Sequence, residues 1–268
     1  MTDPRTRYAF YIPFNLYGQD QRRKSWHARA GAHAEWWMKR ADILREVTLW
    51  SLAQQKEQGF SVVVPVLPVD RKRYDPVKRI VERYGRNHFD SNYVFHVDER
   101  TYDIYGWLMD PFNWMQQAVK GFDYLVMIRL DSDDMYASDM FSHVKKAVPS
   151  PGLVHLCHNG YIWHRKQNKL AEWNAKGNPG PFYAVTYTAE SLESEETLDA
   201  YREEFKLKNY HNTMTHAANK RMIPHGSFCY VLHDRNLSNG FDNKHTRQHM
   251  GEEIVGPERS RILERFGQ

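Results

Sequence analysis

The chain has 268 residues, of which 41% are hydrophobic and 26% are charged, so it can bury the core of one large α/β domain or two small ones. No stretch approaches the roughly 18 apolar residues of a membrane helix, and we expect neither a membrane span nor a signal peptide. The formal net charge of +4 is mild, so it suits an anionic ligand such as a nucleotide and allows nucleic acid without requiring it.

Strands and helices alternate in the predicted order of the first half. Apolar runs predict strands over 8–15, 60–67, 93–98 and 124–128, and amphipathic spacing predicts helices over 41–58, 74–84 and 110–120. We expect Gly59 to end the first of these helices. This order predicts an α/β fold with a doubly wound, mostly parallel central sheet flanked by helices. The sequence contains neither a G-x-G-x-x-G fingerprint nor a P-loop.

The second half is richer in predicted β-structure. We expect a hairpin in which Asn159-Gly160 is the turn between strands over 153–158 and 161–164. Further predicted elements are strands over 169–173 and 182–187, an acidic helix over 194–206, and a late strand that ends in His233.

The two cysteines, Cys157 and Cys229, lie in apolar, strand-like contexts and show no C-x-x-C spacing. This pattern favours buried thiols with structural roles in a reducing compartment. We therefore expect a cytoplasmic protein of a bacterium or of a phage-infected host cell.

The acidic cluster Asp131-Ser132-Asp133-Asp134 follows shortly after the buried strand predicted over 124–128. Ligands of open α/β folds bind where such strands end, and carboxylates this close repel one another. A divalent cation offsets the repulsion, because Mg²⁺ and Mn²⁺ take carboxylate oxygens and keep substrate phosphates as further ligands. Asp131-x-Asp133 is therefore a candidate metal–diphosphate site. Alternatively, the cluster forms a turn that caps a helix predicted over 137–147.

Partners for a nucleotide are expected near this cluster. Arg129, Lys220 and Arg221 are candidates for its phosphates, because arginine matches phosphate in a two-bond fork, although Arg129 could instead pair with a neighbouring acid. Asn15 and Asp98 end predicted strands and are candidates for the base or ribose, although polar residues at strand ends often only complete a turn.

Residues 19–40 combine Arg, Lys and His with three tryptophans, Trp26, Trp36 and Trp37. Such a stretch is commonly a solvated surface. It also suits a segment that binds an anion or an acceptor, because basic groups contact phosphates while indole rings stack on bases or sugars.

The predicted layout is similar to that of GT-A glycosyltransferases, in which a parallel sheet has a central strand ending in D-x-D and the second half is rich in β-structure. The late strand ending in His233 agrees with this layout. More narrowly, the string I-R-L-D-S-D-D at 128–134, with V-L-H-D-R-N at 231–236, resembles a rhamnosyltransferase-like family. The resemblance covers roughly residues 8–236.

The resemblance implies Mn²⁺ or Mg²⁺ held by Asp131, Asp133 and His233 against the diphosphate of a UDP- or dTDP-sugar. It implies a hexosyl- or deoxyhexosyltransferase that acts on a hydroxyl of a glycan. The domain over 1–242 would then comprise a nucleotide-sugar half at about 8–136 and an acceptor half at about 137–242. A charged tail over 243–268, partly helical or mobile, would follow.

A general base is needed if the acceptor is a hydroxyl and the reaction inverts. The candidates are Asp134, His158, His211, His216 and His225, and with 14 histidines in the chain a chance placement of any one is common. Asp134 has the best claim to contact the donor sugar, unless it only caps the following helix.

Three alternative functions stay open. A nucleotidyltransferase or phosphohydrolase also uses clustered carboxylates, but would be expected to carry a third strand-borne acid near the pair. A non-catalytic module that binds nucleic acid or carbohydrate would use the 19–40 segment without needing the acidic cluster. A glycosyltransferase that acts on modified bases in DNA would need both features, with its target base extruded or single-stranded.

Overall fold

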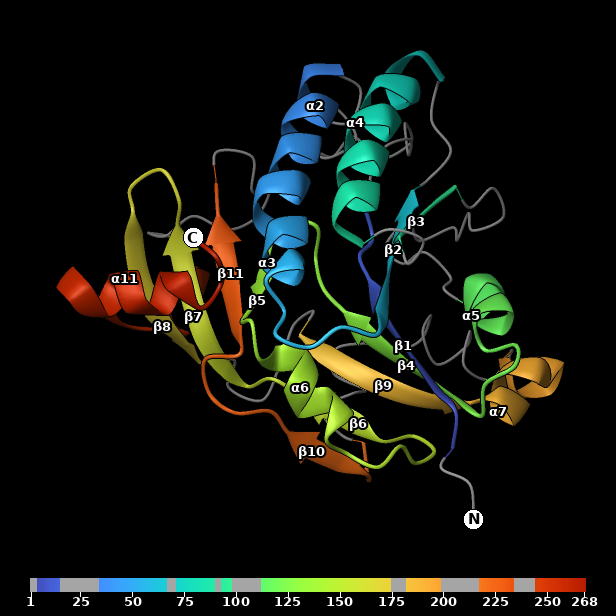
Figure 1. The fold of residues 1–268 in the computed structure, drawn as a ribbon. Coiled ribbons are helices and arrows are strands. Elements are labelled where there is room, and N and C mark those ends of the chain that lie inside the picture. The colour runs from blue at the N-terminus through green and yellow to red at the C-terminus, as the bar shows by residue number, and fades with distance from the viewer. Residues whose placement is uncertain are drawn as a thin grey trace.

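The structure is a computed structural model in which two β-sheets lie side by side (Figure 1). It describes residues 4–14, 34–66, 71–89, 93–97, 112–174, 182–198, 217–233 and 244–268. Within these ranges the predicted fold class is confirmed, because a central, mostly parallel sheet is flanked by helices.

The large sheet has the strand order β10-β6-β9-β4-β1-β2-β3. Its strands are β1 (Thr6–Tyr11), β2 (Phe60–Val66), β3 (Tyr93–Val97), β4 (Tyr124–Arg129), β6 (Val154–Leu156), β9 (Tyr183–Thr188) and β10 (Lys220–Met222). Strand β1 pairs in parallel with both β2 and β4, and β9 runs antiparallel between β4 and β6. The strands predicted in the first half are therefore all present.

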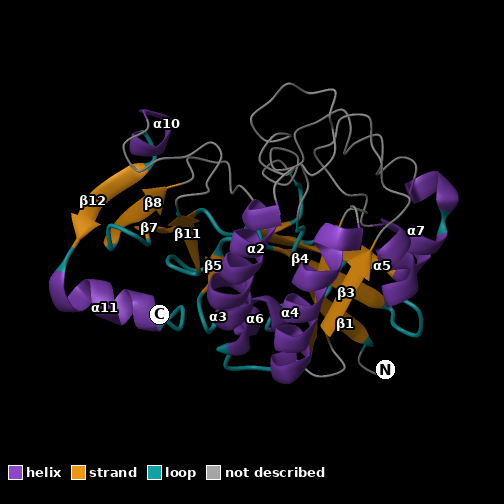
Figure 2. Cartoon of the chain, turned by 90° about the horizontal axis from the view of Figure 1, so that it is seen from above, coloured by secondary structure: helices purple, strands orange, loops and turns teal. Residues whose placement is uncertain are grey.

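Two sets of helices cover the large sheet, as Figure 2 shows from above. Over one face lie α2 (Ala34–Ile43), the π-helix η1 (Leu44–Leu49), α3 (Trp50–Ala53), α4 (Arg71–Phe89) and α6 (Met140–Lys145). Over the other lie α5 (Phe112–Ala118) and α7 (Ala189–Glu193). Alternate residues of β1 face the two layers, with Phe10 buried in the first and Ala9 in the second.

The first long helix ends earlier than predicted. It runs through α2, η1 and α3 to Ala53, and Gly59, at φ +102°, lies just before β2. The reason is tertiary: Nε2 of the buried Gln55 donates to the Ala137 carbonyl at 2.8 Å, and its Oε1 accepts from the Phe141 amide at 3.0 Å. These bonds turn the chain away from the helix axis, so Gly59 does not cap the helix.

The order of the strands reverses beside β1. Strands β2 and β3 lie on one side of β1, whereas β4 lies on the other. Ligands of open α/β sheets bind at such a reversal, outside the carboxyl ends of the strands. Tyr11 in β1 and Arg129 in β4 are register partners at these ends. The acidic cluster that follows Arg129 therefore lies at the reversal.

The second sheet has the order β12-β8-β7-β11-β5. Its strands are β5 (Met135–Tyr136), β7 (Asn159–His164), β8 (Lys169–Asn174), β11 (Phe228–Leu232) and β12 (Met250–Ile254). Strand β5 comes directly after the acidic cluster and pairs with β11. The cluster is thus the point where the chain passes from the large sheet to the second sheet.

The prediction of a hairpin at Asn159-Gly160 is wrong. Strand β6 belongs to the large sheet and β7 to the second, and the hairpin lies between β7 and β8, with Asn168 at φ 51° in its turn. Gly160 is a strand residue: a Cβ there would lie 2.5 Å from the carbonyl oxygen of Phe228 in β11. Glycine is needed for this close approach of two strands, and not for a turn.

The prediction of a charged tail is wrong for residues 244–268, which belong to the fold, although they are partly helical as expected. They form α10 (Lys244–Arg247), β12, which pairs with β8, and α11 (Gly256–Glu264). Ile262, Leu263 and Phe266 are buried against the second sheet. Glutamates such as Glu252, Glu253 and Glu258 are exposed, whereas the apolar stripe faces the sheet. Composition alone does not reveal such a stripe.

Cys157 and Cys229 are both free and fully buried, as predicted, and burial raises the pKa of each thiol. Over the part of the chain that the structure describes, no helix combines the length and apolar character needed to cross a membrane.

Candidate functional site

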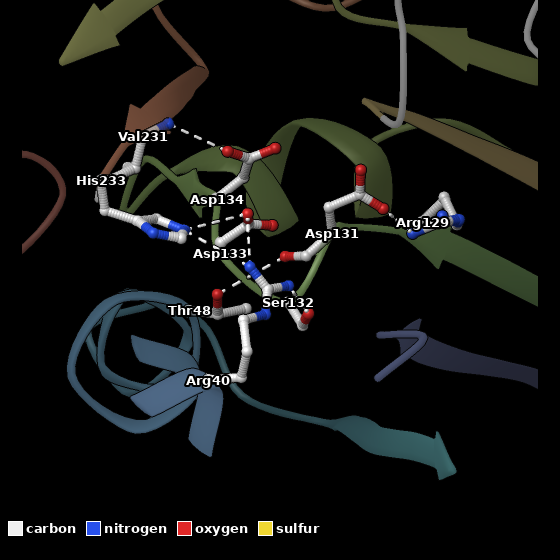
Figure 3. A network of polar contacts seen from close by, with 9 residues as sticks. All are labelled: Arg40, Thr48, Arg129, Asp131, Ser132, Asp133, Asp134, Val231 and His233. Carbon is white, nitrogen blue, oxygen red and sulfur yellow. Dashed lines mark hydrogen bonds and ion pairs between the residues drawn. The ribbon is translucent and has the colours of Figure 1, made fainter. Parts of the chain in front are cut away.

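The acidic turn, residues 131–134, is fastened to both sheets (Figure 3). On the large sheet, the Tyr136 hydroxyl donates to the Arg129 carbonyl at 2.6 Å. On the second sheet, the Asp134 carboxylate accepts from the Val231 amide of β11 at 2.9 Å. The Asp134 amide donates to the Asp131 carbonyl at 3.2 Å and closes the turn. The turn is therefore held in one position relative to β4 and β11.

The acidic turn is not a helix cap. Helix α6 begins at Met140, later than predicted, and Asp139 occupies its N-cap position without a side-chain hydrogen bond to the helix. Asp134 instead points its buried carboxylate at the second sheet. The capping explanation for the cluster does not hold in this structure.

The buried Arg129 forms an ion pair with the partly exposed Asp131 at the end of β4. The Nη1 atom of Arg129 lies 2.7 Å from Oδ1 of Asp131 and donates to the Leu130 carbonyl at 2.9 Å. The Arg129 side chain is 7% exposed and that of Asp131 is 35% exposed. Burial lowers the pKa of Arg129, but Asp131, Tyr183 and Tyr11 together more than offset this effect, so the pKa is raised and the guanidinium stays charged. The predicted pairing of Arg129 with a neighbouring acid is what the structure shows.

A second arginine, Arg40 of α2, binds the other side of the acidic turn. Its Nη1 donates to Oδ2 of Asp133 at 2.7 Å, and its Nη2 donates to the Ser132 hydroxyl at 2.7 Å. Nε2 of His233, just past β11, lies 3.2 Å from the same Asp133 oxygen and 3.4 Å from Nη1 of Arg40. Three distant segments of the chain thus meet at Asp133, as Figure 3 shows.

The two neighbouring carboxyls of the turn titrate in opposite directions. Burial raises the pKa of Asp133, but Arg40 and His233 outweigh it and hold that pKa well below its usual range. Burial, followed by the charges of Asp133 and Asp131, raises the pKa of Asp134 well above its usual range. Asp133 is therefore firmly anionic, whereas Asp134 readily holds a proton.

The predicted metal ligands do not fit a metal centre in this arrangement. Asp131 is engaged by Arg129, and Asp133 and His233 are engaged by Arg40. Among the described residues, no three His, Cys, Asp or Glu side chains are placed so that they could hold a metal ion. Two guanidinium groups supply the positive charge that the sequence pattern assigns to a cation.

Arg40 is not among the individual site residues that the sequence predicts, although it is the last residue of the 19–40 segment, for which anion or acceptor binding is an alternative. It lies 93 positions before Asp133, so no local motif connects the two. One signal was available: Leu44 and Val47, four and seven positions later, are fully buried, so Arg40 continues the apolar stripe of its helix. An arginine on a buried helix face needs an acidic partner.

His158 lies at the same edge of the large sheet as the acidic turn. It follows β6, which runs in the direction of β4 because antiparallel β9 lies between them. Its Nε2 is buried and has no hydrogen-bond partner in the described ranges. Burial, and then the charge of Lys220, lowers the pKa of His158.

The structure does not bring His225, Lys220 or Arg221 to the acidic turn. His225 precedes β11 and His233 follows it, and this five-residue strand is roughly 16 Å long. Lys220 and Arg221 are exposed on β10, the edge strand, with β6 and β9 between them and β4.

The remaining predicted residues lie outside the described ranges. These are Asn15, Asp98, His211 and His216, together with residues 19–33 of the basic, tryptophan-rich segment and residues 234–236 of the second motif.

No protein family matches the chain, and no curated protein is similar to it in sequence. Solved structures do resemble it. S. aureus TarS 1–349 in complex with UDP is 16% identical, with a TM-score of 0.42, over 84% of this chain and 60% of that one. The glycosyltransferase GlyE of Streptococcus pneumoniae TIGR4 is 8% identical, with a TM-score of 0.43, over 98% of this chain and 61% of that one.

A nucleotidyltransferase resembles the chain to the same degree. The inositol-1-phosphate CTP transferase of T. maritima is 9% identical, with a TM-score of 0.41, over 100% of this chain and 98% of that one. The chain spans about 60% of the length of TarS 1–349. Similarity at this level assigns the chain to no family.

Proposed function

We propose that the chain is a glycosyltransferase that takes its sugar from a nucleoside-diphosphate-sugar bound at the carboxyl ends of β1 and β4. The observation that carries the proposal is the acidic turn at the reversal of strand order, bound by the buried Arg129, the partly buried Arg40 and a histidine from three segments. Nucleotides bind α/β sheets at this position, and arginine is well matched to phosphate oxygens.

The charges of the site suit departure of a nucleoside diphosphate. Breaking the bond from the anomeric carbon to the phosphate oxygen leaves positive charge on the sugar and negative charge on the diphosphate. Guanidinium groups held in place beforehand stabilise the departing phosphate without reorganising. Carboxylates of the turn, such as Asp131 at 35% exposure, are suited to face the positive side of the sugar.

A nucleotidyltransferase fits the site less well. That chemistry commonly holds two metals between several carboxylates, about 3.5–4 Å apart. In the described ranges no group of three acids or histidines could hold even one metal ion. The string at 128–134 also resembles the rhamnosyltransferase-like family, which favours transfer of a hexosyl or deoxyhexosyl group from UDP or dTDP.

His158 is the general base that we propose for a hydroxyl acceptor. It is at the right edge of the sheet, its Nε2 has no described partner, and its lowered pKa keeps the imidazole neutral near pH 7. Asp134 is a weaker candidate, because its carboxylate is buried and hydrogen-bonded to the Val231 amide.

We propose a glycan hydroxyl as the acceptor. A modified base in DNA is the second candidate, because residues 19–40 mix basic and tryptophan side chains.

The test of the donor site is thermal unfolding with a panel of nucleoside diphosphates. A ligand at a hundred times its dissociation constant adds about 2.7 kcal/mol of stability, which a melting curve resolves easily. We expect one diphosphate to raise the melting temperature of the wild-type chain, and Arg129→Ala to reduce that rise. If none of the diphosphates changes the melting temperature, the proposed donor site is wrong.

A further inference from the structure

We infer that Arg40 takes the role of a divalent cation at the acidic turn, so that the chain binds its diphosphate donor without a metal. This inference rests on the proposed function and concerns the same site. It reverses the roles that the D-x-D pattern suggests: Asp133, Ser132 and His233 position an arginine, and the arginine contacts the phosphates.

The first support is the position of the Arg40 guanidinium. It binds Oδ2 of Asp133 and the Ser132 hydroxyl at 2.7 Å each, and it lies 3.4 Å from Nε2 of His233. A cation held by Asp133 and His233 would have to occupy the same place. The Arg40 and Asp133 side chains are 13% and 17% exposed, so the pair lies close to the surface that a ligand would reach.

The second support is charge balance. Asp131 and Asp133 carry two negative charges, and Arg129 and Arg40 carry two positive charges in contact with them. The third carboxyl, Asp134, is only 2% exposed and is satisfied by the Val231 amide. Among the described residues these two ion pairs are neutral, and a divalent cation would add two charges to a partly buried group, which is costly unless Arg40 leaves.

The third support is that Arg40 is anchored at its base. Four positions later Leu44 is fully buried, and Val47 and Leu49 are fully buried in the next turn. These residues fix the helix on the sheet, and the two bonds to the turn fix the guanidinium. Displacing Arg40 would leave a charged side chain without its anion in a partly buried position. A guanidinium has five N–H donors in a planar fork, so one that binds carboxylates can also bind phosphate.

The experiment measures diphosphate binding and metal binding separately on the full chain. The diphosphate that stabilises the wild type is titrated by calorimetry, once with excess EDTA and once with Mn²⁺. Mn²⁺ alone is titrated by the loss of its free electron paramagnetic resonance signal. We expect dissociation constants that agree within about twofold with and without metal, and no stoichiometric Mn²⁺ binding.

For Arg40→Ala we expect the opposite of the wild type, namely diphosphate binding that depends on Mn²⁺. Removing the guanidinium should weaken diphosphate binding in EDTA by about tenfold or more, because charge-assisted bonds to phosphate are lost. It should also free Asp133 and His233, so that Mn²⁺ now binds and partly restores diphosphate affinity. Arg40→Lys should lie between the wild type and Arg40→Ala, because lysine keeps the charge and loses the fork. Lys39→Ala, at the exposed neighbouring position, is the matched control and should behave as the wild type.

Two results would overturn the inference. If the wild type binds the diphosphate only with Mn²⁺, or binds Mn²⁺ stoichiometrically by itself, the donor site stands and Arg40 is not the substitute. If the wild type binds no diphosphate in either condition, the proposed function fails and the inference fails with it. The wild-type titrations decide this even if Arg40→Ala does not fold.

Discussion

At the scale of single residues, the site depends on side chains that compensate one another's charges. Arg129 and Arg40 each bind one carboxylate of the acidic turn, while Asp134 bonds to the backbone of β11. The strand and the acids were predictable from local sequence, because an apolar run followed by carboxylates is a local pattern. The contacts of Arg40 with Asp133 and of Val231 with Asp134 were not predictable, because they join residues that are 93 and 97 positions apart in the chain.

His158 should control the acid side of the pH profile. Its pKa is lowered from the ordinary histidine value of about 6.5, so the neutral imidazole that accepts a proton persists below that pH. Turnover should therefore stay constant down to about pH 6.5 and fall only at lower pH. His158→Gln should lower kcat by about 10²- to 10⁴-fold and abolish the acid limb. If His158→Gln keeps the wild-type kcat and the fall in turnover at low pH, His158 is not the base.

Asp134 should matter for stability. Asp134→Ala removes the carboxylate that accepts from the buried Val231 amide, which should lower the free energy of unfolding in urea by about 1–3 kcal/mol. Asp134→Asn keeps an oxygen acceptor and cannot ionise. Because the pKa of Asp134 is raised in the fold, the wild type loses stability as pH rises through that pKa, whereas the asparagine variant does not. The free energy of unfolding of the asparagine variant should therefore rise relative to that of the wild type between pH 5 and pH 8. A difference in unfolding free energy that stays constant over this range would contradict the prediction.

At the scale of elements, the sequence predicted strands better than it predicted which strands pair. The apolar runs of β1, β2 and β4 lie where periodicity placed them, whereas Asn159-Gly160 suggested a turn that does not exist. The local rule predicts a turn at Asn-Gly. Here, however, glycine is required because Phe228, 68 positions away in the chain, leaves no room for a Cβ at position 160. Such a contact is visible only once the second sheet is assembled.

Gly160→Ala should therefore destabilise the second sheet. The new Cβ would lie 2.5 Å from the Phe228 carbonyl oxygen and 2.8 Å from its ring, so β7 and β11 must separate. Overpacking of this kind costs about 1–3 kcal/mol, measurable by urea unfolding. The exposed neighbour Asn159→Ala is the control and should change stability little. Equal stabilities of the two variants would show that Gly160 is not under packing constraint.

At the scale of the whole molecule, the C-terminal segment completes the second sheet. Composition suggested a charged tail, because the segment is rich in glutamate and arginine. In the fold, Ile262, Leu263 and Phe266 join the core formed by β7, β8 and β11, and the Trp50 indole donates to the Gly267 carbonyl at 2.6 Å. The segment therefore links the second sheet to the helices that carry Arg40.

Phe266→Ala should cost about 3–5 kcal/mol of unfolding free energy, because it empties a fully buried aromatic site. Val255→Ala, at a side chain that is 64% exposed, is the control and should cost little. Chemical denaturation of both variants measures the difference. If Phe266→Ala is as stable as Val255→Ala, the C-terminal segment does not contribute to the core as the structure indicates.

The central claim is that the chain breaks the bond between a sugar and a nucleoside diphosphate. The most direct measurement is to incubate the wild-type chain with UDP- and dTDP-sugars and to separate the nucleotide products by chromatography. Glycosyl transfer, or slow transfer to water, releases the nucleoside diphosphate, and we predict this product for the wild type and less of it for Arg40→Ala when both are assayed in EDTA. Release of the nucleoside monophosphate would mean that water cleaves the bond within the diphosphate, and would contradict the account in favour of a phosphohydrolase.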